Sequence, residues 1–552
     1  MKSHTIRRAC IFSSLIALVA FAVYMNTLYN GFIWDDYFIV ENSSKSGLGL
    51  YQIARFFIDK NAYHAPGEIY RPLYLFSFAL DYRIYGSSPW GWHLTNICLH
   101  IINSVLVYFF ALSLLSGRGD LDEPTRRVGL AALGAALVFA VHPVHTESVA
   151  WIKGRDDMLA CVFILASFIF YIAYSHRQKG LKYYCASIIT FIPALLSKEM
   201  ALTLPLLFIL YELCFKPSGL RRGKGLTALV PFFVLAGLYL GVRTAVTGQV
   251  AQTAYFGGGL GPALFTTARG FVRYFSLLTI PLNQCGDYLA FPLSYGLTPR
   301  VILSILIVGA FLAAGVVSYF FFLRPLAFLI FWFFVTMMPV SNIIPLKILL
   351  AERFLYIPSV GIFVLFGMVF SGVLEKARPR AGLRRFLIIT ALLVMTLYAF
   401  AAVERNRVWR DERTFWSDVI AKYPGARAYT NYGLAMEDEG DIRGAIKFYQ
   451  EALKMDPRFS YALNNLAANY LKEGLVDEAI KSYREAVAIE PGNAVMHSGL
   501  GDAYRKKGLL KEAAAEYRRA IELDPGSDAV MGLARVYIDL GLTGEAKKLL
   551  MR

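Results

Sequence analysis

The sequence has few cysteines and no pairing pattern among them. Its 552 residues include six Cys, none of which forms a CxxC pair, and most of these lie inside apolar stretches. A disulfide framework or a zinc knuckle is therefore not supported. Charged residues are also scarce, at 17% against 56% hydrophobic residues. Such a chain is too apolar for a soluble protein and too long for a single domain.

Several catalytic signatures are missing as well. The chain contains no Walker loop, no GxSxG or HExxH motif and no dinucleotide fingerprint. A cytosolic nucleotide donor therefore has no support. The formal net charge of +16 is compatible with nucleic-acid binding, but in a membrane protein it is ordinarily carried by basic cytoplasmic loops. We therefore expect no nucleic-acid partner.

Long apolar segments are what the sequence has in abundance. Windows of about 20 apolar residues recur from residue 9 to residue 402, whereas residues 403–552 lack them. The predicted fold class is all-α, with a polytopic membrane helical bundle over residues 1–402 and a soluble domain over residues 403–552. About eleven spans are expected, near residues 9–29, 94–116, 128–142, 157–175, 181–197, 200–215, 226–242, 300–322, 325–341, 353–374 and 386–402.

Basic residues predict the orientation of these spans. Lys and Arg clusters follow the second, fourth, sixth and tenth spans, and each cluster is cytoplasmic if the N-terminus is cytoplasmic. Residues 263–282 are apolar but carry two Arg, and a span there would move the Arg-rich loop 375–385 outside. We therefore predict a re-entrant or interfacial helix at 263–282. The C-terminal domain is then non-cytoplasmic.

The first apolar segment has an alternative interpretation as a cleaved signal peptide. Basic residues precede it, and Ala20-Phe21-Ala22 resembles a cleavage site. The apolar run continues to about Leu28, however, which is long enough to span a membrane. We expect an uncleaved first span.

With a cytoplasmic N-terminus, all the polar motifs that lie between the spans are on the non-cytoplasmic side of the membrane. Ionisable residues at the ends of spans are costly and usually mark a pathway or site. The motifs therefore predict a polar cavity at the outer leaflet. They are Trp34-Asp35-Asp36; Tyr70-Arg71-Pro72-Leu73; His93 and Asn96; His142-Pro143-Val144-His145-Thr146-Glu147; Gly154-Arg155-Asp156-Asp157; Ser197-Lys198-Glu199; Asp287-Tyr288; and Ala351-Glu352-Arg353-Phe354-Leu355-Tyr356.

The C-terminal domain is a repeat. Gly440, Gly474 and Gly508 recur every 34 residues, and Ala, Tyr and Pro recur with the same period. This pattern is typical of tetratricopeptide repeats, whose concave surface binds peptides or partner proteins. We expect a partial repeat at 405–424, full repeats at about 427–460, 461–494 and 495–528, and terminal helices over 529–552.

Asp35 and Asp36 are the candidate catalytic residues. A carboxylate can act as the general base that removes the proton of a reacting hydroxyl group, and burial would raise its pKa toward that task. The second acid could orient the first, or bind a metal or an acceptor hydroxyl. The alternative is that the pair caps a juxtamembrane helix. Either aspartate could be the base.

Four cations are candidates for binding a phosphate, namely Lys198, Arg353, Arg71 and Arg155. A Lys ammonium binds phosphate as a point charge, and guanidinium groups bind it in a bidentate manner. Alternatively, Lys198 forms an ion pair with Glu199 that holds a helical hairpin, and Arg155 forms part of a salt-linked span start. Further candidates for contact with substrate are Trp34, His93, His142, His145, Glu147, Asp156, Glu199, Glu352 and Tyr356.

The histidines also raise the question of zinc. His142 and His145 are three residues apart, but Pro143 follows the first directly and a third ligand is unassigned. We predict no transition-metal site. Polar packing or hydrogen bonding to substrate is the expected role of this motif. No cofactor is required, and a divalent cation is compatible with the acidic pair.

Taken together, these motifs and the trailing repeats resemble the transmembrane and tetratricopeptide-repeat O-mannosyltransferases and their bacterial relatives. The resemblance covers nearly the whole chain. It rests on the motifs around Asp35–Asp36, Arg71, His142–Glu147, Arg155–Asp157, Lys198 and Glu352–Tyr356, which are specific only in combination. It implies a GT-C glycosyltransferase in which the acidic pair of the first outer loop, Asp35 and Asp36, carries catalysis.

The function that we predict is transfer of a sugar, such as mannose, from a polyprenyl-phosphate donor to a hydroxyl acceptor. The resemblance favours Ser or Thr of a protein as acceptor, one-step inversion, and a multi-pass location, such as the bacterial inner membrane, with periplasmic or lumenal repeats. The repeats would bind the acceptor or a partner protein. Only about three full repeats are present, fewer than eukaryotic members carry. Two alternatives remain: a non-catalytic scaffold that recruits envelope proteins, and a GT-C enzyme that glycosylates a lipid.

Overall fold

The chain divides into two helical units. The computed structural model describes residues 3–45, 55–57, 70–116, 125–176, 180–216, 224–248, 254–321 and 323–551. Over these residues it is helical and contains no strand, which confirms the predicted all-α fold class. Unit 1 comprises residues 1–411 and unit 2 comprises residues 412–552. The division falls after Asp411 and not at residue 402, because the last long helix of unit 1 continues to Val408.

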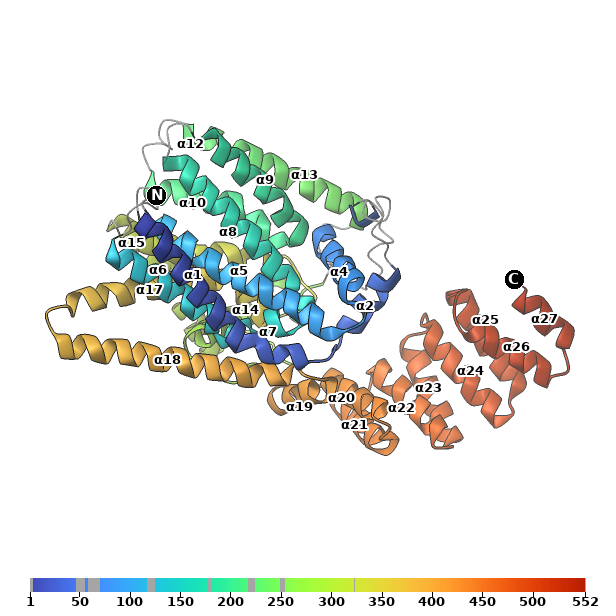
Figure 1. The fold of residues 1–552 in the computed structure, drawn as a ribbon. Helices are drawn as coiled ribbons and strands as arrows, with labels where there is room; N and C mark the ends of the chain where they lie inside the picture. The colour runs from blue at the N-terminus through green and yellow to red at the C-terminus, as the bar shows by residue number, and fades with distance from the viewer. Residues whose placement is uncertain are drawn as a thin grey trace. The chain divides into compact units, whose positions relative to one another are not determined.

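Unit 1 is a bundle of long helices joined by short helical turns (Figure 1). Its longer helices are α1 (Ser3–Tyr24), α5 (Pro89–Leu115), α6 (Arg126–Val141), α8 (Arg155–His176), α9 (Leu181–Ser197), α10 (Leu204–Phe215), α13 (Val230–Thr247), α14 (Leu260–Thr279), α15 (Pro299–Phe320), α16 (Arg324–Met337), α17 (Pro358–Lys376) and α18 (Ala381–Val408). Its shorter helices are α2 (Asp36–Lys45), α4 (Pro72–Tyr85), α7 (Thr146–Ala150) and α12 (Lys224–Thr227). Its 3-10 turns are η1 (Met25–Tyr29), η3 (Pro143–His145), η4 (Ile152–Gly154), η5 (Glu199–Thr203), η6 (Phe256–Gly258), η7 (Met338–Val340) and η8 (Glu352–Leu355).

Each of the eleven segments predicted as spans is helical, but they differ in length. In the part of the chain that the structure describes, seven helices are long and apolar enough to cross a membrane, and α6 with its bent continuation through 143–150 would make an eighth. Two further apolar helices, α9 and α16, are shorter, and α10 has only 12 residues. Hydropathy therefore located the helices correctly but predicted more full-length spans than their lengths support.

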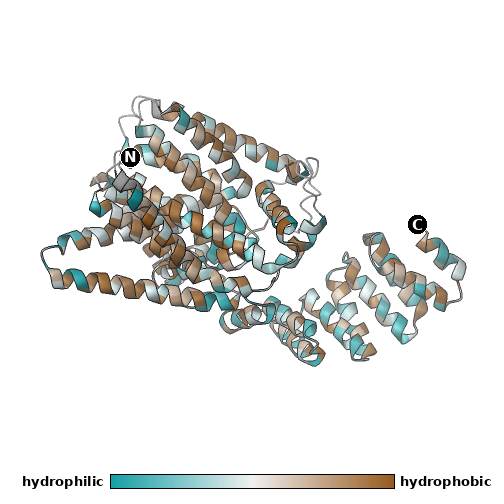
Figure 2. Cartoon of the chain, viewed as in Figure 1, coloured by the Kyte–Doolittle hydropathy of each residue, from teal (hydrophilic) through white to brown (hydrophobic). Residues whose placement is uncertain are grey.

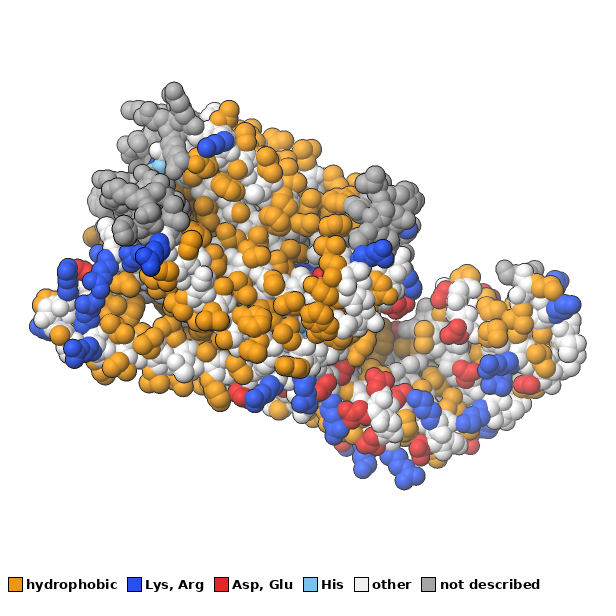
Figure 3. Space-filling model, in the orientation of Figure 1, with side chains coloured by type: hydrophobic (Ala, Val, Ile, Leu, Met, Phe, Trp, Pro, Cys, Tyr) orange, Lys and Arg blue, Asp and Glu red, His pale blue; other side chains and the backbone are white. Residues whose placement is uncertain are grey.

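The apolar character of unit 1 continues onto its surface. Hydrophobic residues run along most of these helices (Figure 2), and hydrophobic side chains dominate the face visible in Figure 3. Such a surface is costly in water and suits contact with lipid. The apolar helices identify unit 1 as a membrane domain.

The centre of unit 1 is formed by α5, α6, α8 and α17. Helix α5 packs against α6 and α8, and α17 packs against α6. The α6–α17 contact is so close that a Cβ atom on Gly367 would lie 2.2 Å from the backbone oxygen of Ala131. Small residues at such a crossing let two helices approach with tight van der Waals packing. This core supports the turns on which the charged motifs lie.

Helix α14 covers most of the segment 263–282 that we predicted to be interfacial. It is not among the helices that qualify as spans by length and composition in the described part of the chain. Its two arginines donate to backbone oxygens of the segment that follows, Arg269 to Pro292 at 2.9 Å and Arg273 to Leu282 at 2.9 Å. The arginines thus bind the connecting segment that returns beside the helix.

Unit 2 is a stack of antiparallel helix pairs. Its helices are α19 (Glu412–Lys422), α20 (Ala426–Asp438), α21 (Ile442–Met455), α22 (Ser460–Lys472), α23 (Val476–Ile489), α24 (Ala494–Lys507), α25 (Leu510–Leu523), α26 (Ala529–Asp539) and α27 (Thr543–Leu550). The expected terminal helices form a fourth pair, α26 with α27. Of the partial repeat expected at 405–424, α19 belongs to unit 2, whereas the residues up to Val408 continue α18.

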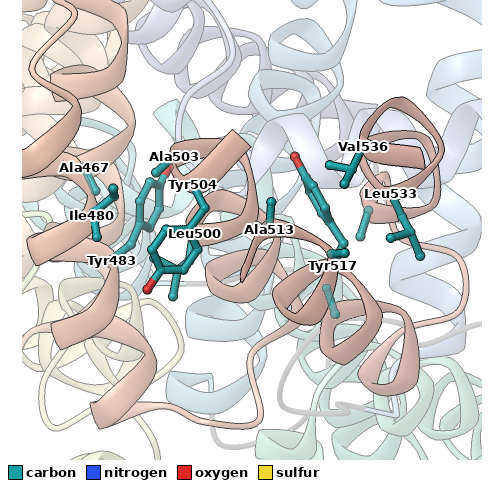
Figure 4. Close-up of a cluster of buried hydrophobic side chains, with 13 residues drawn as sticks. Ala467, Ile480, Tyr483, Leu500, Ala503, Tyr504, Ala513, Tyr517, Leu533 and Val536 are labelled. Atoms are coloured by element: carbon teal, nitrogen blue, oxygen red, sulfur yellow. The ribbon is translucent and has the colours of Figure 1, made fainter. Parts of the chain in front are cut away.

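The repeat positions have the packing roles that their spacing predicts. Gly440, Gly474 and Gly508 all have a positive φ, between 81° and 87°, just after the first helix of each pair. That conformation favours glycine and ends the helix. Tyr483 and Tyr517 fill the space between helix pairs together with Leu500 and small Ala residues (Figure 4).

Candidate active site

The charged candidate residues of unit 1 lie in short segments between the long helices or in the first turn of a long helix. Asp35 and Asp36 lie at the turn that begins α2, Arg71 precedes α4, and Lys198 precedes η5. Asp156 and Asp157 begin α8, Glu147 lies in α7, and Arg353 lies in η8. Ion pairs and ring contacts join these segments. The motifs that the sequence spreads over more than 300 residues therefore meet at one place.

The two aspartates have different surroundings. Asp36 is buried, and its carboxylate accepts the backbone N–H of Ile33 on Oδ2 and that of Lys153 on Oδ1, both at 3.2 Å. Asp35 is partly exposed and forms an ion pair with the Lys153 ammonium. Trp34, just before them, has a positive φ of 53°, a strained conformation for a bulky residue. The turn therefore buries one carboxylate and presents the other.

Burial raises the pKa of Asp36 to about 8, and the negative charge of Asp35 adds to the rise, while the two backbone N–H donors oppose it. A carboxyl with such a pKa holds a proton at neutral pH.

Lys153 is a site residue that the sequence analysis did not select. It lies in η4, between the motif that ends at Glu147 and the motif that begins at Gly154. Its backbone N–H binds Asp36 and its side chain binds Asp35. A lone lysine carries little signal, but its place between two candidate motifs could have drawn attention to it.

Arg71 joins two of the predicted motifs. Its guanidinium donates to Glu199 from Nε at 3.1 Å and from NH2 at 2.7 Å, and its NH1 forms an ion pair with Asp156. Lys198 lies beside it, 2.5 Å from Asp157 Oδ2 and 3.4 Å from Asp156 Oδ1. The alternative interpretation expected an ion pair between Lys198 and its neighbour Glu199. Lys198 is instead paired with the first turn of α8.

Trp151 connects the acidic pair with the cationic residues. Its ring stacks on Trp34, with centroids 5.2 Å apart and planes 13° from parallel. Lys153 Nζ lies 5.5 Å and Arg353 Cζ 5.2 Å from the same ring. Arg353 also forms an ion pair with Glu147. Asp35 and Arg353 thus belong to one site, organised around an indole ring that the sequence analysis did not select.

Arg155 does not reach this site. Its guanidinium is fully buried and binds Asp81 at 2.5 Å, Asn96 Oδ1 at 2.9 Å and the backbone oxygen of Trp92 at 3.1 Å. Its planar set of donors is therefore directed to protein acceptors. The expectation that Arg155 binds a donor phosphate is corrected to a structural role that ties α8 to α4 and α5.

Glu352 also has a structural environment. It accepts hydrogen bonds from Gln284 Nε2 at 2.8 Å, the Cys285 backbone N–H at 2.7 Å and Tyr288 OH at 2.6 Å. Burial raises the pKa of this carboxyl. With three protein donors, Glu352 holds the segment after α14 against η8, which replaces the expected contact with substrate.

The histidines and Tyr356 lie inside the bundle. His100 binds Tyr356 OH at 2.8 Å, and His145 binds Ser359 Oγ at 3.0 Å. His142 accepts the Val144 backbone N–H at 3.2 Å, and His93 lies 3.4 Å from the Gly31 oxygen. These contacts are polar packing within the protein, and the side chain of Tyr356 has no exposed surface. Among the residues that the structure describes, no group of three or more His, Cys, Asp and Glu could hold a metal ion.

Comparison with known proteins gives matches over both units. The family described as Tetratricopeptide repeat matches residues 433–494, 464–528 and 498–549. Human Protein O-mannosyl-transferase TMTC4 is 30% identical over 79% of this chain and 64% of its own length. Drosophila melanogaster Protein O-mannosyl-transferase Tmtc3 is 28% identical over 70% and 48%, and human TMTC1 is 26% identical over 82% and 56%. The chain thus spans about half to two thirds of the length of these curated relatives.

Proposed function

This chain is a relative of the transmembrane and tetratricopeptide-repeat protein O-mannosyl-transferases, and on that premise we propose that it is a membrane glycosyltransferase. The donor is a polyprenyl-phosphate sugar, such as mannose, and the acceptor is a Ser or Thr hydroxyl of a protein. The names of the relatives support the sugar and the protein acceptor. The observation that carries the proposal is the partly exposed Asp35 carboxylate, held within one network of ion pairs and ring contacts with Lys153 and Arg353.

The reaction follows from the chemistry of these groups. Asp35 removes the proton of the acceptor hydroxyl as that oxygen attacks the anomeric carbon of the sugar. The bond between the anomeric carbon and the phosphate oxygen breaks, and the electron pair leaves with polyprenyl phosphate. Attack opposite to the leaving group inverts the anomeric carbon in one step. Nearby cations stabilise the charge that develops on the phosphate.

Asp36 acts as a positioning residue. It is buried and accepts backbone N–H groups on both oxygens, from Ile33 before the acidic turn and from Lys153 in η4. These bonds hold the two segments together and fix the orientation of Asp35. Reacting groups must be held within a fraction of an ångström of a productive geometry. Asp36 is therefore needed for geometry and does not touch the acceptor.

The active site opens on the non-cytoplasmic face of a multi-pass membrane protein, such as one of the bacterial inner membrane, and the repeats bind the acceptor polypeptide or a partner. The positive-inside distribution of Lys and Arg supports this orientation. A solenoid of stacked helix pairs presents an extended surface suited to a polypeptide. A lipid acceptor would not need such a surface.

The experiment is transfer in proteoliposomes. The purified full-length protein is reconstituted with a radiolabelled polyprenyl-phosphate mannose and a Ser/Thr-rich peptide, and label on the peptide is counted. Asp35→Asn is expected to lower transfer about 100-fold or more, the scale of general-base catalysis. Glu404→Gln is the control because Glu404 is also a partly exposed carboxylate in an ion pair, with Arg407. Lack of transfer by the wild type, or full transfer by Asp35→Asn, would contradict the assignment.

A further inference from the structure

The charged groups of the site differ in how far they are exposed. The side chains of Asp35 and Lys153 are each 38% exposed. The other cations of the site are more deeply buried, at 3% for Lys198, 11% for Arg353 and 15% for Arg71. The Asp35–Lys153 ion pair is thus the part of the charge network that an incoming ligand reaches first.

The buried cations are already committed to buried carboxylates. Lys198 is paired with Asp157, and Arg353 is paired with Glu147, a carboxylate with no exposed surface. A phosphate that drew either cation away would leave a buried negative charge unpaired, which is strongly unfavourable. Separating Lys153 from Asp35 leaves a carboxylate that water still reaches, and a pair of this kind is weak.

We propose that Lys153 is the residue that receives the phosphate of the lipid-linked donor. On binding, its ammonium leaves Asp35 and pairs with the phosphate, so that the donor itself releases the catalytic base. This assignment rests on the proposed function and deepens it. The pairing of Asp35 with Lys153 then has a role in the reaction, because an aspartate held by an ammonium group cannot activate a hydroxyl group before the sugar is in place.

The backbone around Lys153 supports such a movement of the side chain alone. Its N–H is fixed by Asp36 Oδ1, and its segment η4 continues directly into α8. A lysine side chain turns about four carbon–carbon bonds on such a fixed backbone. Lys153 and Arg353 lie near the same Trp151 ring, at 5.5 Å and 5.2 Å. A phosphate bound by Lys153 therefore enters the field of Arg353, whose pairing with Glu147 stays intact.

The test measures binding apart from catalysis. A short-chain polyprenyl phosphate, which is the leaving group, is titrated into the full-length protein in detergent, and its dissociation constant is read from tryptophan fluorescence. Lys153→Ala is expected to weaken binding about tenfold or more, whereas Lys153→Arg retains most of it because it keeps the charge. Binding of the uncharged polyprenyl alcohol should not change. The control is Lys454→Ala, which removes an exposed lysine paired with Glu451 in the repeats.

The aspartate gives a second, opposite readout. If Lys153 must leave Asp35 to bind phosphate, Asp35→Asn should tighten binding of polyprenyl phosphate several-fold while it lowers sugar transfer. This variant removes a partly exposed charge and keeps the shape of the side chain, so it also serves if Lys153→Ala does not fold.

The outcomes separate this proposal from the proposed function. One outcome is that the wild-type protein transfers sugar while Lys153→Ala and Asp35→Asn bind polyprenyl phosphate as tightly as the wild type does. This would overturn the role of Lys153 and leave the glycosyltransferase assignment standing. Affinity that depends on Lys153 without any sugar transfer would support the phosphate site and count against the function. Absence of polyprenyl-phosphate binding by the wild type would overturn both.

Discussion

Asp36 accepts the backbone N–H of Lys153 at 3.2 Å, while the side chain of Lys153 binds the adjacent Asp35. One residue of the 152–154 turn therefore contacts both carboxylates of the acidic pair. The contact joins the first loop of the chain to the start of α8, more than 110 residues later in the sequence. It gives two identical neighbouring side chains different partners, a backbone N–H for Asp36 and an ammonium group for Asp35.

The buried state of Asp36 predicts how stability depends on pH. Its pKa is raised from 3.8 to about 8, mainly by burial. The folded state then keeps a proton that the unfolded state loses, so the stability from this group is fully present below about pH 4 and is lost as pH rises through about 8. We expect the difference in melting temperature, wild type minus Asp36→Asn, to decrease as the pH is raised from 5 to 8.5. A difference that is flat or rises, with Glu404→Gln as control, would contradict the burial of Asp36.

The Lys198–Asp157 pair should be important for folding. Asp157 has no exposed surface, and Lys198 lies 2.5 Å from its Oδ2. Lys198→Met should destabilise the protein by about 3–5 kcal/mol because it leaves a buried charge unpaired. The double variant Lys198→Met with Asp157→Leu should recover part of that loss. Unfolding free energies in mixed micelles measure both effects. A change below about 0.5 kcal/mol, as expected for Lys454→Met at the surface, would show that the pair is not buried.

The repeat unit offers a matched pair of glycines. Gly474 has a φ of +81° after α22, whereas Gly492 lies in another turn, has no positive φ and has open space around it. Gly474→Ala should cost about 1–2 kcal/mol, since an L-residue is strained in that conformation. Gly492→Ala should have little effect. In the full-length protein, amide hydrogens at the end of α22 should exchange at least about fivefold faster in Gly474→Ala than in the wild type, because the helix end is less stable. Equal exchange in the two variants would contradict the helix end described for α22.

Orientation across the membrane is open to a simple test. The loops that follow α5, α8, α10 and α17 are rich in Lys and Arg, which predicts that they face the cytoplasm. A reporter fused after Arg552 should then read as non-cytoplasmic, on the same side as a reporter inserted after Lys45, at the end of α2. A cytoplasmic signal from the C-terminus would separate the repeats from the acidic pair and favour the scaffold interpretation.

Features that depend on local sequence could be predicted well. Each apolar window predicted as a span is helical, and the expected repeats begin within about a residue of the first helix of each pair, at Ala426, Ser460 and Ala494. Both features follow from a regular pattern along the chain. Long-range partners could not be predicted in the same way. The pairing of Arg155 with Asp81, the contact of Lys153 with both aspartates and the stacking of Trp34 on Trp151 are set by how the helices pack. Sequence motifs identify the charged residues, but they do not show which of them are paired with an opposite charge inside the protein.

The most direct test of the account is the rate of the chemical step in Asp35→Asn. The protein is saturated with polyprenyl-phosphate mannose, a Ser/Thr peptide is added in excess, and a single turnover is followed by rapid quench. We predict that Asp35→Asn transfers sugar about 100-fold or more slowly than the wild type, although it binds the donor at least as tightly. A single-turnover rate within about twofold of the wild type, with Glu404→Gln unchanged, would contradict the claim that Asp35 is the base.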